Sequence, residues 1–177
     1  YLYDEGYKLA SFDVKSLFTN VPLHKTITII IDRIYNKKFI TTTLSKRTLK
    51  KLILDTCSKT AFTFAGIKYE QIDRVSMGAC LGPVLANIIM TELELVVVEN
   101  LIETGLIKFY TRYVDDTLLL VKVEDADTIL NSFNSFHTNL EFTVDRFENY
   151  VPHFLDLEIH RDGISIFRKE THIISSL

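Results

Sequence analysis

Two adjacent aspartates, Asp115 and Asp116, interrupt the otherwise apolar run KFYTRYVDDTLLLV at residues 108–121. Neighbouring carboxylates repel each other and resist burial, so either water or a bound cation has to compensate them. The segments IKFYTRY and TLLLVKV on either side have the composition of β-strands. We therefore predict a β-hairpin that carries both aspartates at its tip.

The size and composition of the chain favour one globular domain, elaborated by a subdomain, because 177 residues with 47% hydrophobic content can bury a sizeable core. The formal net charge of −3 argues against a chain that binds nucleic acid strongly by itself. Cys57 and Cys80 lack CxxC spacing and the histidines lack HxxxH spacing, so we expect no zinc site, no disulfide framework and a reducing compartment. Because the sequence starts without Met and stops within a segment, we expect it to be part of a longer protein.

The most apolar segment, residues 83–102, predicts a largely buried helix, and Pro83 suits its first turn. Within it, Asn87, Glu92, Glu94 and Glu99 would be costly in a bilayer, so we expect no membrane span.

The remaining segments alternate between strand and helix patterns. Residues 8–14, KLASFDV, predict a buried strand that ends at or near Asp13, and Pro22 suits the first turn of a helix with isoleucines at helical spacing. Ser45 is placed to cap a second helix. The further predicted elements are a hairpin over 60–71, a helix over 124–137, a strand at 142–147 and a hairpin turning at Asp162 and Gly163. This order indicates an α+β fold with an antiparallel sheet.

The predicted layout suggests a chemistry for the acidic residues. If the strand that ends at Asp13 lies beside the hairpin, three carboxylates meet at one edge of the sheet. Such a cluster fits Mg²⁺, which takes oxygen ligands, and two such ions can drive an in-line displacement at phosphorus. Two alternatives stay open on the residues alone: a pair of aspartates is most often a solvated turn, and nucleases and nucleotide cyclases also use paired carboxylates.

Four segments, in order, resemble motifs A, B, C and E of reverse transcriptases: SFDVKSLFTNVP (11–22), MGACLGPVLANIIM (77–90), RYVDD (112–116) and PHFLDLEI (152–159). The first, second and fourth are most similar to those of Penelope-like retroelements. The resemblance implies a right-hand polymerase palm, with an antiparallel sheet and helices packed on one face, plus part of the fingers. The palm would comprise residues 1–20 and 76–165, the fingers-side insertion 21–75, and the start of the thumb connection 166–177.

The resemblance also implies a role for each matching residue. Asp13, Asp115 and Asp116 would be catalytic and, with the main-chain carbonyl of Val14, would hold two Mg²⁺ ions, for which Mn²⁺ is a substitute. Phe18 would exclude the 2′-hydroxyl of a ribonucleotide by steric clash. The remaining nucleotide contacts would come from Ser16, Leu17, Met77 and Gly78, and the primer and template contacts from Tyr113, Pro83, Phe154 and Leu155.

The implied activity is RNA-directed DNA polymerisation, with an RNA template, a DNA primer and dNTPs as partners and no membrane. The implied location is intracellular, and nuclear for a retroelement enzyme; the oligomeric state stays open. Motif B departs from the related elements, because Ala79, Cys80 and Gly82 replace two serines and a proline. A catalytically inactive palm that binds nucleic acid or protein is therefore the alternative. We expect Lys108 and Arg112 to be solvated strand charges.

Overall fold

The computed structural model describes residues 6–37, 40–57, 61–70, 75, 80–145, 151–160 and 163–166. Its centre is a four-stranded antiparallel sheet in the order β4-β5-β1-β6. These strands are β1 (Tyr7–Val14), β4 (Ile107–Tyr113), β5 (Asp116–Lys122) and β6 (Phe142–Val144). The predicted first strand is therefore a central strand, and the predicted hairpin is β4 with β5.

Strand β1 has buried side chains on both faces, and these alternate between two cores. Ala10, Phe12 and Val14 belong to the main core, whereas Leu9 belongs to a smaller cluster with Leu118 and Leu120 on the opposite face. This alternation follows from the two-residue period of a strand.

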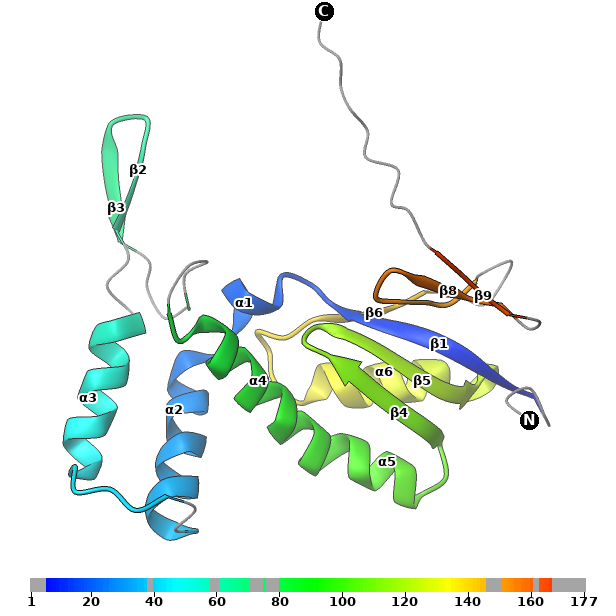
Figure 1. Ribbon diagram of the computed structural model, residues 1–177, viewed down its shortest axis with the longest axis horizontal. Helices are drawn as coiled ribbons and strands as arrows, with labels where there is room; N and C mark the ends of the chain where they lie inside the picture. The colour runs from blue at the N-terminus through cyan, green and yellow to red at the C-terminus, as the bar shows by residue number, and fades with distance from the viewer. Residues whose placement is uncertain are drawn as a thin grey trace, which may run out of the picture.

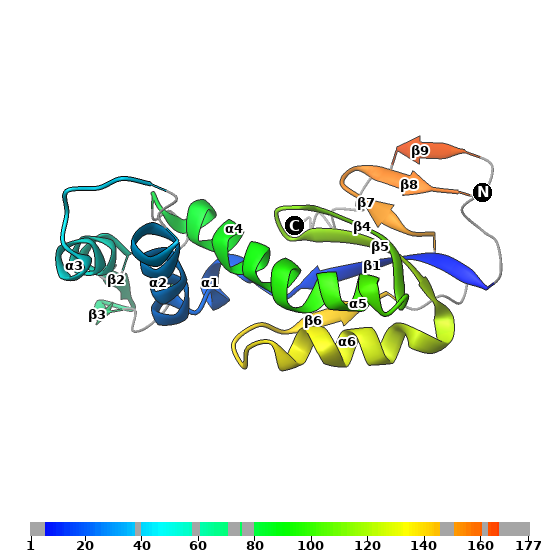
Figure 2. The same cartoon turned by 90° about the horizontal axis from the view of Figure 1, so that it is seen from below.

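Helices cover the main-core face of the sheet (Figure 2). A long helix runs through α4 (Gly82–Leu93), a π-helical segment (Glu94–Val98) and α5 (Glu99–Glu103). A short 3₁₀ turn (Val123–Asp125) leads into α6 (Ala126–Ser135). Both helices point fully buried side chains at the sheet, among them Leu85, Ile89 and Leu93 of α4 and Ile129 and Phe133 of α6. The prediction of helices packed on one face of an antiparallel sheet is confirmed.

A second group of elements lies beyond the sheet (Figure 1). It contains α1 (Leu17–Asn20), α2 (Leu23–Ile31) with a π-helical turn (Asp32–Asn36), α3 (Lys46–Cys57) and the hairpin of β2 (Ala61–Phe64) and β3 (Ile67–Glu70). Ser45 caps α3 as predicted, because its hydroxyl accepts the Thr48 amide at 3.1 Å. Pro22 lies just before α2 rather than within its first turn, whereas Pro83 lies in the first turn of α4.

The helix predicted over 83–102 is confirmed, with a π-helical segment that its sequence did not announce. Two of its acidic residues have arginine partners: Arg33 donates to Glu92 at 2.8 Å, and Arg112 donates to Glu94 at 2.6 Å. These ion pairs explain how a largely apolar helix tolerates carboxylates. Among the described residues, no helix is long and apolar enough to cross a membrane.

A three-stranded antiparallel sheet, in the order β7-β8-β9, lies against the smaller cluster on the face of β1 and β5 away from the helices. Its strands are β7 (His153–Phe154), β8 (Leu157–Ile159) and β9 (Ile164–Ile166). The pairing of β8 with β9 confirms the last predicted hairpin, although Asp162 lies outside the described residues. The described part of the predicted strand at 142–147 is β6, which ends at Val144.

Candidate active site

The hairpin of β4 and β5 turns at Val114 and Asp115. Tyr113 faces Asp116 across the ladder, so only these two residues form the turn. Val114 has a φ of 57°, a left-handed conformation that is sparsely populated for a β-branched residue. Both predicted aspartates therefore lie at the tip of the hairpin, and the turn that presents Asp115 is strained.

The register of β1 against β5 places Asp13 beside the same tip. Phe12 faces Thr117 on the main-core side. Asp13, one residue after Phe12, and Asp116, one residue before Thr117, therefore lie on the opposite face. Two side-chain hydrogen bonds fix the strands here: the buried Thr117 hydroxyl donates to the Phe12 carbonyl, and the Ser11 hydroxyl donates to the Thr117 carbonyl at 3.4 Å. Asp13 and Asp116 thus project from adjacent strands that side-chain hydrogen bonds hold together.

These side chains line an open pocket of about 570 Å³. Asp13, Asp115 and Asp116 line it together, as the sequence analysis expected. The predicted primer residues Tyr113 and Leu155 also line it. The other lining residues had no individual role assigned from the sequence, although the segment that resembles motif E contains two of them: Ser11, Val114, Asp145, His153 and Asp156.

Two of the additional lining residues are carboxylates whose positions follow from strand pairing. Asp145 comes directly after β6, and its amide donates to the Ser11 carbonyl of β1 at 3.2 Å. Asp156 occupies the turn between β7 and β8. The segments FTVDRF and FLDL contain both residues, but the sequence shows neither the partner of β6 nor the sheet face that β7 and β8 cover.

The donor chemistry of the pocket fits a hard divalent cation, because five of its lining residues are aspartates. In the described part of the chain, however, no three acidic, histidine or cysteine side chains are grouped around one point as metal ligands. The expected convergence of three carboxylates is thus a shared pocket rather than a closed cage. Mg²⁺ needs no such cage, since it binds through one or two carboxylates and completes its shell with water and substrate phosphates.

The predicted nucleotide residues that follow Asp13 form a tight turn beside β1. Ser16 has a φ of 48°, and its carbonyl accepts the Asn20 amide at 3.2 Å and the Thr19 hydroxyl at 3.1 Å. Leu17 is buried in the main core, and Phe18 is half-buried against it. These residues adjoin the pocket along the chain but are not part of its described lining.

The other predicted residues are distributed around the site. Pro83 is exposed at the start of α4, and Phe154 packs against the smaller cluster with Leu9. Val14 is buried at the end of β1 and faces Phe142 of β6. Met77 and Gly78 lie outside the described residues.

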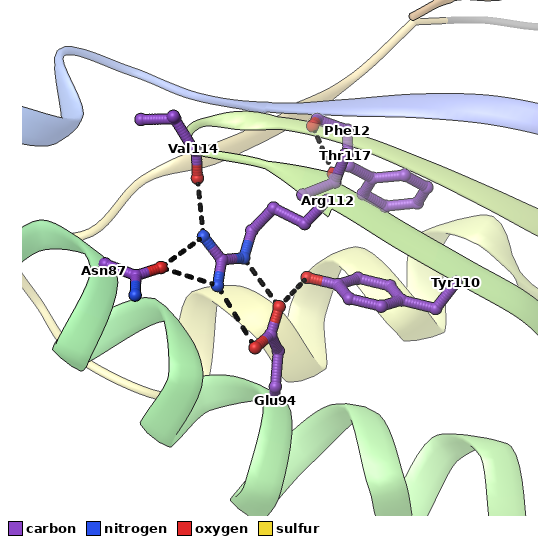
Figure 3. A network of polar contacts seen from close by, with 7 residues as sticks. All are labelled: Phe12, Asn87, Glu94, Tyr110, Arg112, Val114 and Thr117. Atoms are coloured by element: carbon purple, nitrogen blue, oxygen red, sulfur yellow. Dashed lines mark hydrogen bonds and ion pairs between the residues drawn. The ribbon is translucent and has the colours of Figure 1, made fainter.

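Arg112 is not the solvated strand charge that the sequence predicted. Only 8% of its side chain is exposed, and its guanidinium donates to both oxygens of Glu94, at 2.6 and 3.2 Å (Figure 3). It also donates to the Val114 carbonyl at 3.0 Å and to the Asn87 side-chain oxygen at 3.3 Å. Lys108, by contrast, is exposed as expected, with its amine 5.6 Å from the Tyr7 ring.

The electrostatics of this cluster favour one charge state. Burial by itself lowers the pKa of the Arg112 guanidinium, but the hydrogen bonds and charge of Glu94 outweigh burial and raise it. Burial, followed by the charge of Glu94, raises the pKa of the Tyr110 phenol, whose hydroxyl donates to Glu94 at 3.1 Å. Arg112 is therefore charged and Tyr110 neutral at any physiological pH.

Comparison with solved structures defines the class of fold. Telomerase from Candida albicans, in complex with a TWJ fragment of telomeric RNA, is similar with a TM-score of 0.68 and 12% identity over 92% of this chain and 32% of that chain. Apo telomerase from Candida tropicalis, truncated from its C-terminal domain, is similar with a TM-score of 0.64 and 14% identity over 90% of this chain and 35% of that one. The chain thus has a right-hand polymerase fold and spans about a third of the telomerase chains it matches.

The family follows from sequence. The model of the family described as reverse transcriptase (RNA-dependent DNA polymerase) matches residues 4–146, and the chain belongs to that family. A search of curated proteins returned no match.

Proposed function

We propose that this chain is the catalytic core of an RNA-directed DNA polymerase, which adds nucleotides from dNTPs to a DNA 3′-hydroxyl opposite an RNA template. The observation that carries the proposal is that Asp13, Asp115 and Asp116 of a reverse transcriptase family member line one open pocket. An open, acidic pocket suits metal-assisted phosphoryl transfer, because substrate phosphates must reach the ions.

In this proposal Asp13, Asp115 and the Val14 carbonyl hold the cations, and Asp116 lies toward the primer end. Bound Mg²⁺, or Mn²⁺ in its place, supplies activation of the attacking hydroxyl and stabilisation of the leaving pyrophosphate. The chain itself positions the carboxylates. The Thr117 and Ser11 hydroxyls hold β1 and β5 together next to the aspartates, so the carboxylates need little reorganisation. The negative charge of the carboxylates attracts the cations that the reaction needs.

The nucleotide would lie over the turn after Asp13, where the backbone amides of Ser16 and Leu17 can face its phosphates. Phe18 would meet the sugar at C2′. Further contacts are assigned to Met77 and Gly78 for the nucleotide and to Tyr113, Pro83, Phe154 and Leu155 for the primer and template. Leu155 and Tyr113 support this assignment, because they line the same pocket as the aspartates.

The division of the chain is part of the proposal: palm at 1–20 and 76–165, fingers-side insertion at 21–75 and start of the thumb connection at 166–177. The projection of α2, α3 and the β2–β3 hairpin away from the sheet supports the insertion (Figure 1). The sequences of the segments SFDVKSLFTNVP and FLDL support an origin in a Penelope-like retroelement. Such an enzyme would act inside the cell, in the nucleus.

A specific feature favours a second candidate, a palm that has lost its chemistry and binds nucleic acid or protein. Ala79, Cys80 and Gly82 replace residues whose hydroxyls and ring shape the motif B turn in related elements. Loss of these groups would weaken placement of the nucleotide or template, even with all three aspartates present.

Primer extension on an RNA template with dNTPs and Mg²⁺ tests the proposal, run on the full-length protein beside Asp115→Asn. The matched control is Asp127→Asn, which makes the same change at an exposed position in the first turn of α6. We expect the parent and the control to extend the primer. Asp115→Asn should lose extension but unfold at the same temperature as the parent. Retained extension in Asp115→Asn would remove Asp115 from the chemistry. A folded parent that does not extend would favour the inactive palm.

A further inference from the structure

We propose that Arg112 is a positioning residue that holds the Val114–Asp115 turn in its strained conformation and ties that turn to helix α4. The inference rests on the proposed function, because it assigns to Arg112 the placement of the Asp115 carboxylate. It starts from a structural need: a valine at a φ of 57° does not hold a left-handed turn by its own preference.

The contact that meets this need is the hydrogen bond from an Arg112 terminal nitrogen to the Val114 carbonyl at 3.0 Å. That carbonyl belongs to the peptide unit joining Val114 to Asp115, and a peptide unit is planar. Fixing the direction of the carbonyl therefore fixes the orientation of the Asp115 amide and restricts where its side chain can point. Arg112 thus acts on Asp115 without touching the pocket, whose described lining does not include it.

The guanidinium is itself held from the other side (Figure 3). Glu94 accepts from two of its nitrogens, at 2.6 and 3.2 Å, and Asn87 accepts from both terminal nitrogens at 3.3 Å. Glu94 and Asn87 are seven positions apart on one helix, so they share a face. A planar, bidentate fork is rigid in a way that a lysine amine is not.

The arrangement ties the tip of the β4–β5 hairpin to helix α4, which begins at Gly82. Its residues Asn87 and Glu94 hold Arg112, which holds the turn of Asp115. A displacement of α4 would therefore move the Asp115 turn through the Arg112 side chain. The Arg112–Glu94 ion pair is also costly to break, because either charge would then be largely buried without its partner.

The test combines two measurements on the full-length protein. The first is hydrogen exchange of the backbone amides in residues 113–118, followed by mass spectrometry, which needs no activity. The second is the Mg²⁺ concentration at which primer extension is half-maximal. The variants are Arg112→Gln, Arg112→Lys and Glu94→Gln, all measured well below their unfolding temperatures. The matched control is Tyr110→Phe, which removes a hydrogen bond to the same Glu94 oxygen from the same strand but leaves the Val114 contact.

For Arg112→Gln we expect exchange in 113–118 to accelerate roughly tenfold, the factor that corresponds to loss of one hydrogen bond from a charged group. We expect the half-maximal Mg²⁺ concentration to rise by about the same factor, with the KM for dNTP little changed. Arg112→Lys and Glu94→Gln should fall between Arg112→Gln and the parent, and Tyr110→Phe should match the parent.

Unchanged exchange in Arg112→Gln would overturn the inference. So would an equal acceleration in Tyr110→Phe, because the effect would then be general loosening of the sheet. If the parent does not extend primers, the proposed function fails, and the exchange measurement alone decides whether Arg112 holds the turn. If Arg112→Gln does not fold, Glu94→Gln and Arg112→Lys, which preserve the size or the charge of the side chain, decide in the same way.

Discussion

The Phe18 side chain, five positions after Asp13, packs against the main core but is only half-buried, so part of the residue is open to solvent. If the free edge meets the nucleotide sugar, Phe18→Ala should raise the acceptance of ribonucleotides relative to deoxyribonucleotides roughly ten- to hundredfold, the range that steric selection in a pocket provides. The ratio of kcat/KM for a dNTP and the matching rNTP measures this. Phe18→Tyr, which keeps the ring, should leave the ratio near that of the parent; an unchanged ratio in Phe18→Ala would reject the steric gate.

Single residues differ in how well the sequence predicts them. Asp13 and Asp115 were predicted to lie close together because each follows an apolar strand within a recognisable motif. Arg112 was misjudged, since its partner Glu94 lies 18 positions earlier on a helix and no local pattern connects them. Asp145 was missed for a similar reason: its neighbour Ser11 is on a strand at the other end of the sequence. Long-range pairing decides both cases.

At the scale of the elements, helix α6 packs one large aromatic side chain, Phe133, against the sheet. Phe133 is fully buried, with its ring centre 5.5 Å from that of Phe12 on β1 and 5.2 Å from that of Phe142 on β6. Phe133→Ala should therefore reduce the free energy of unfolding by about 3–5 kcal/mol, because it removes a large buried side chain and leaves a cavity. Urea unfolding measures the change.

The control for this substitution is Phe109→Ala on β4, where the same atoms are lost from a residue that is 45% exposed. It should cost about 1 kcal/mol, since less apolar surface leaves water on folding. Similar losses at both positions would show that α6 does not depend on Phe133. A clearly larger loss at Phe133 would show that β1, which carries Asp13, and β6, which Asp145 follows, are held in place from the helix side.

Element types followed from local pattern more reliably than element details. Periodicity and turn residues gave the helices and hairpins, and Ser45 was correctly placed at the start of α3. The π-helical segment from Glu94 to Val98 was not predicted, because no residue type marks the extra residue per turn. This segment contains Glu94, which accepts hydrogen bonds from Arg112 of β4, and no local sequence pattern indicates that contact.

At the scale of the whole molecule, the α+β class and the antiparallel sheet followed from the order of the elements. The strand order β4-β5-β1-β6 was predicted only where β1 meets the hairpin. The placement of β7, β8 and β9 depends on Leu9, Leu118 and Leu120, which form a second apolar face on the central strands. Strands that are apolar on both faces do not indicate which cover lies on which side.

The charge of the whole chain leads to a prediction about nucleic acid. The net charge is −3 and the candidate site is lined by five aspartates, so a primer–template duplex meets repulsion unless cations neutralise the pocket. The 177-residue chain should bind an RNA–DNA duplex weakly, and more tightly with Mg²⁺ than with EDTA at equal ionic strength. Fluorescence anisotropy of a labelled duplex measures both affinities.

The salt dependence of that binding distinguishes the source of the affinity. Because each neutralised phosphate adds about 0.9 to the slope of log K against log salt, a chain with few phosphate contacts should show a slope below about 3 in magnitude. Asp115→Asn should reduce the Mg²⁺ effect and leave the slope unchanged, since the substitution removes a cation ligand and no basic side chain. Nanomolar binding with a steep slope in EDTA would contradict the prediction. It would mean that the lysines and arginines of this chain form a phosphate-binding surface strong enough to overcome the acidic pocket.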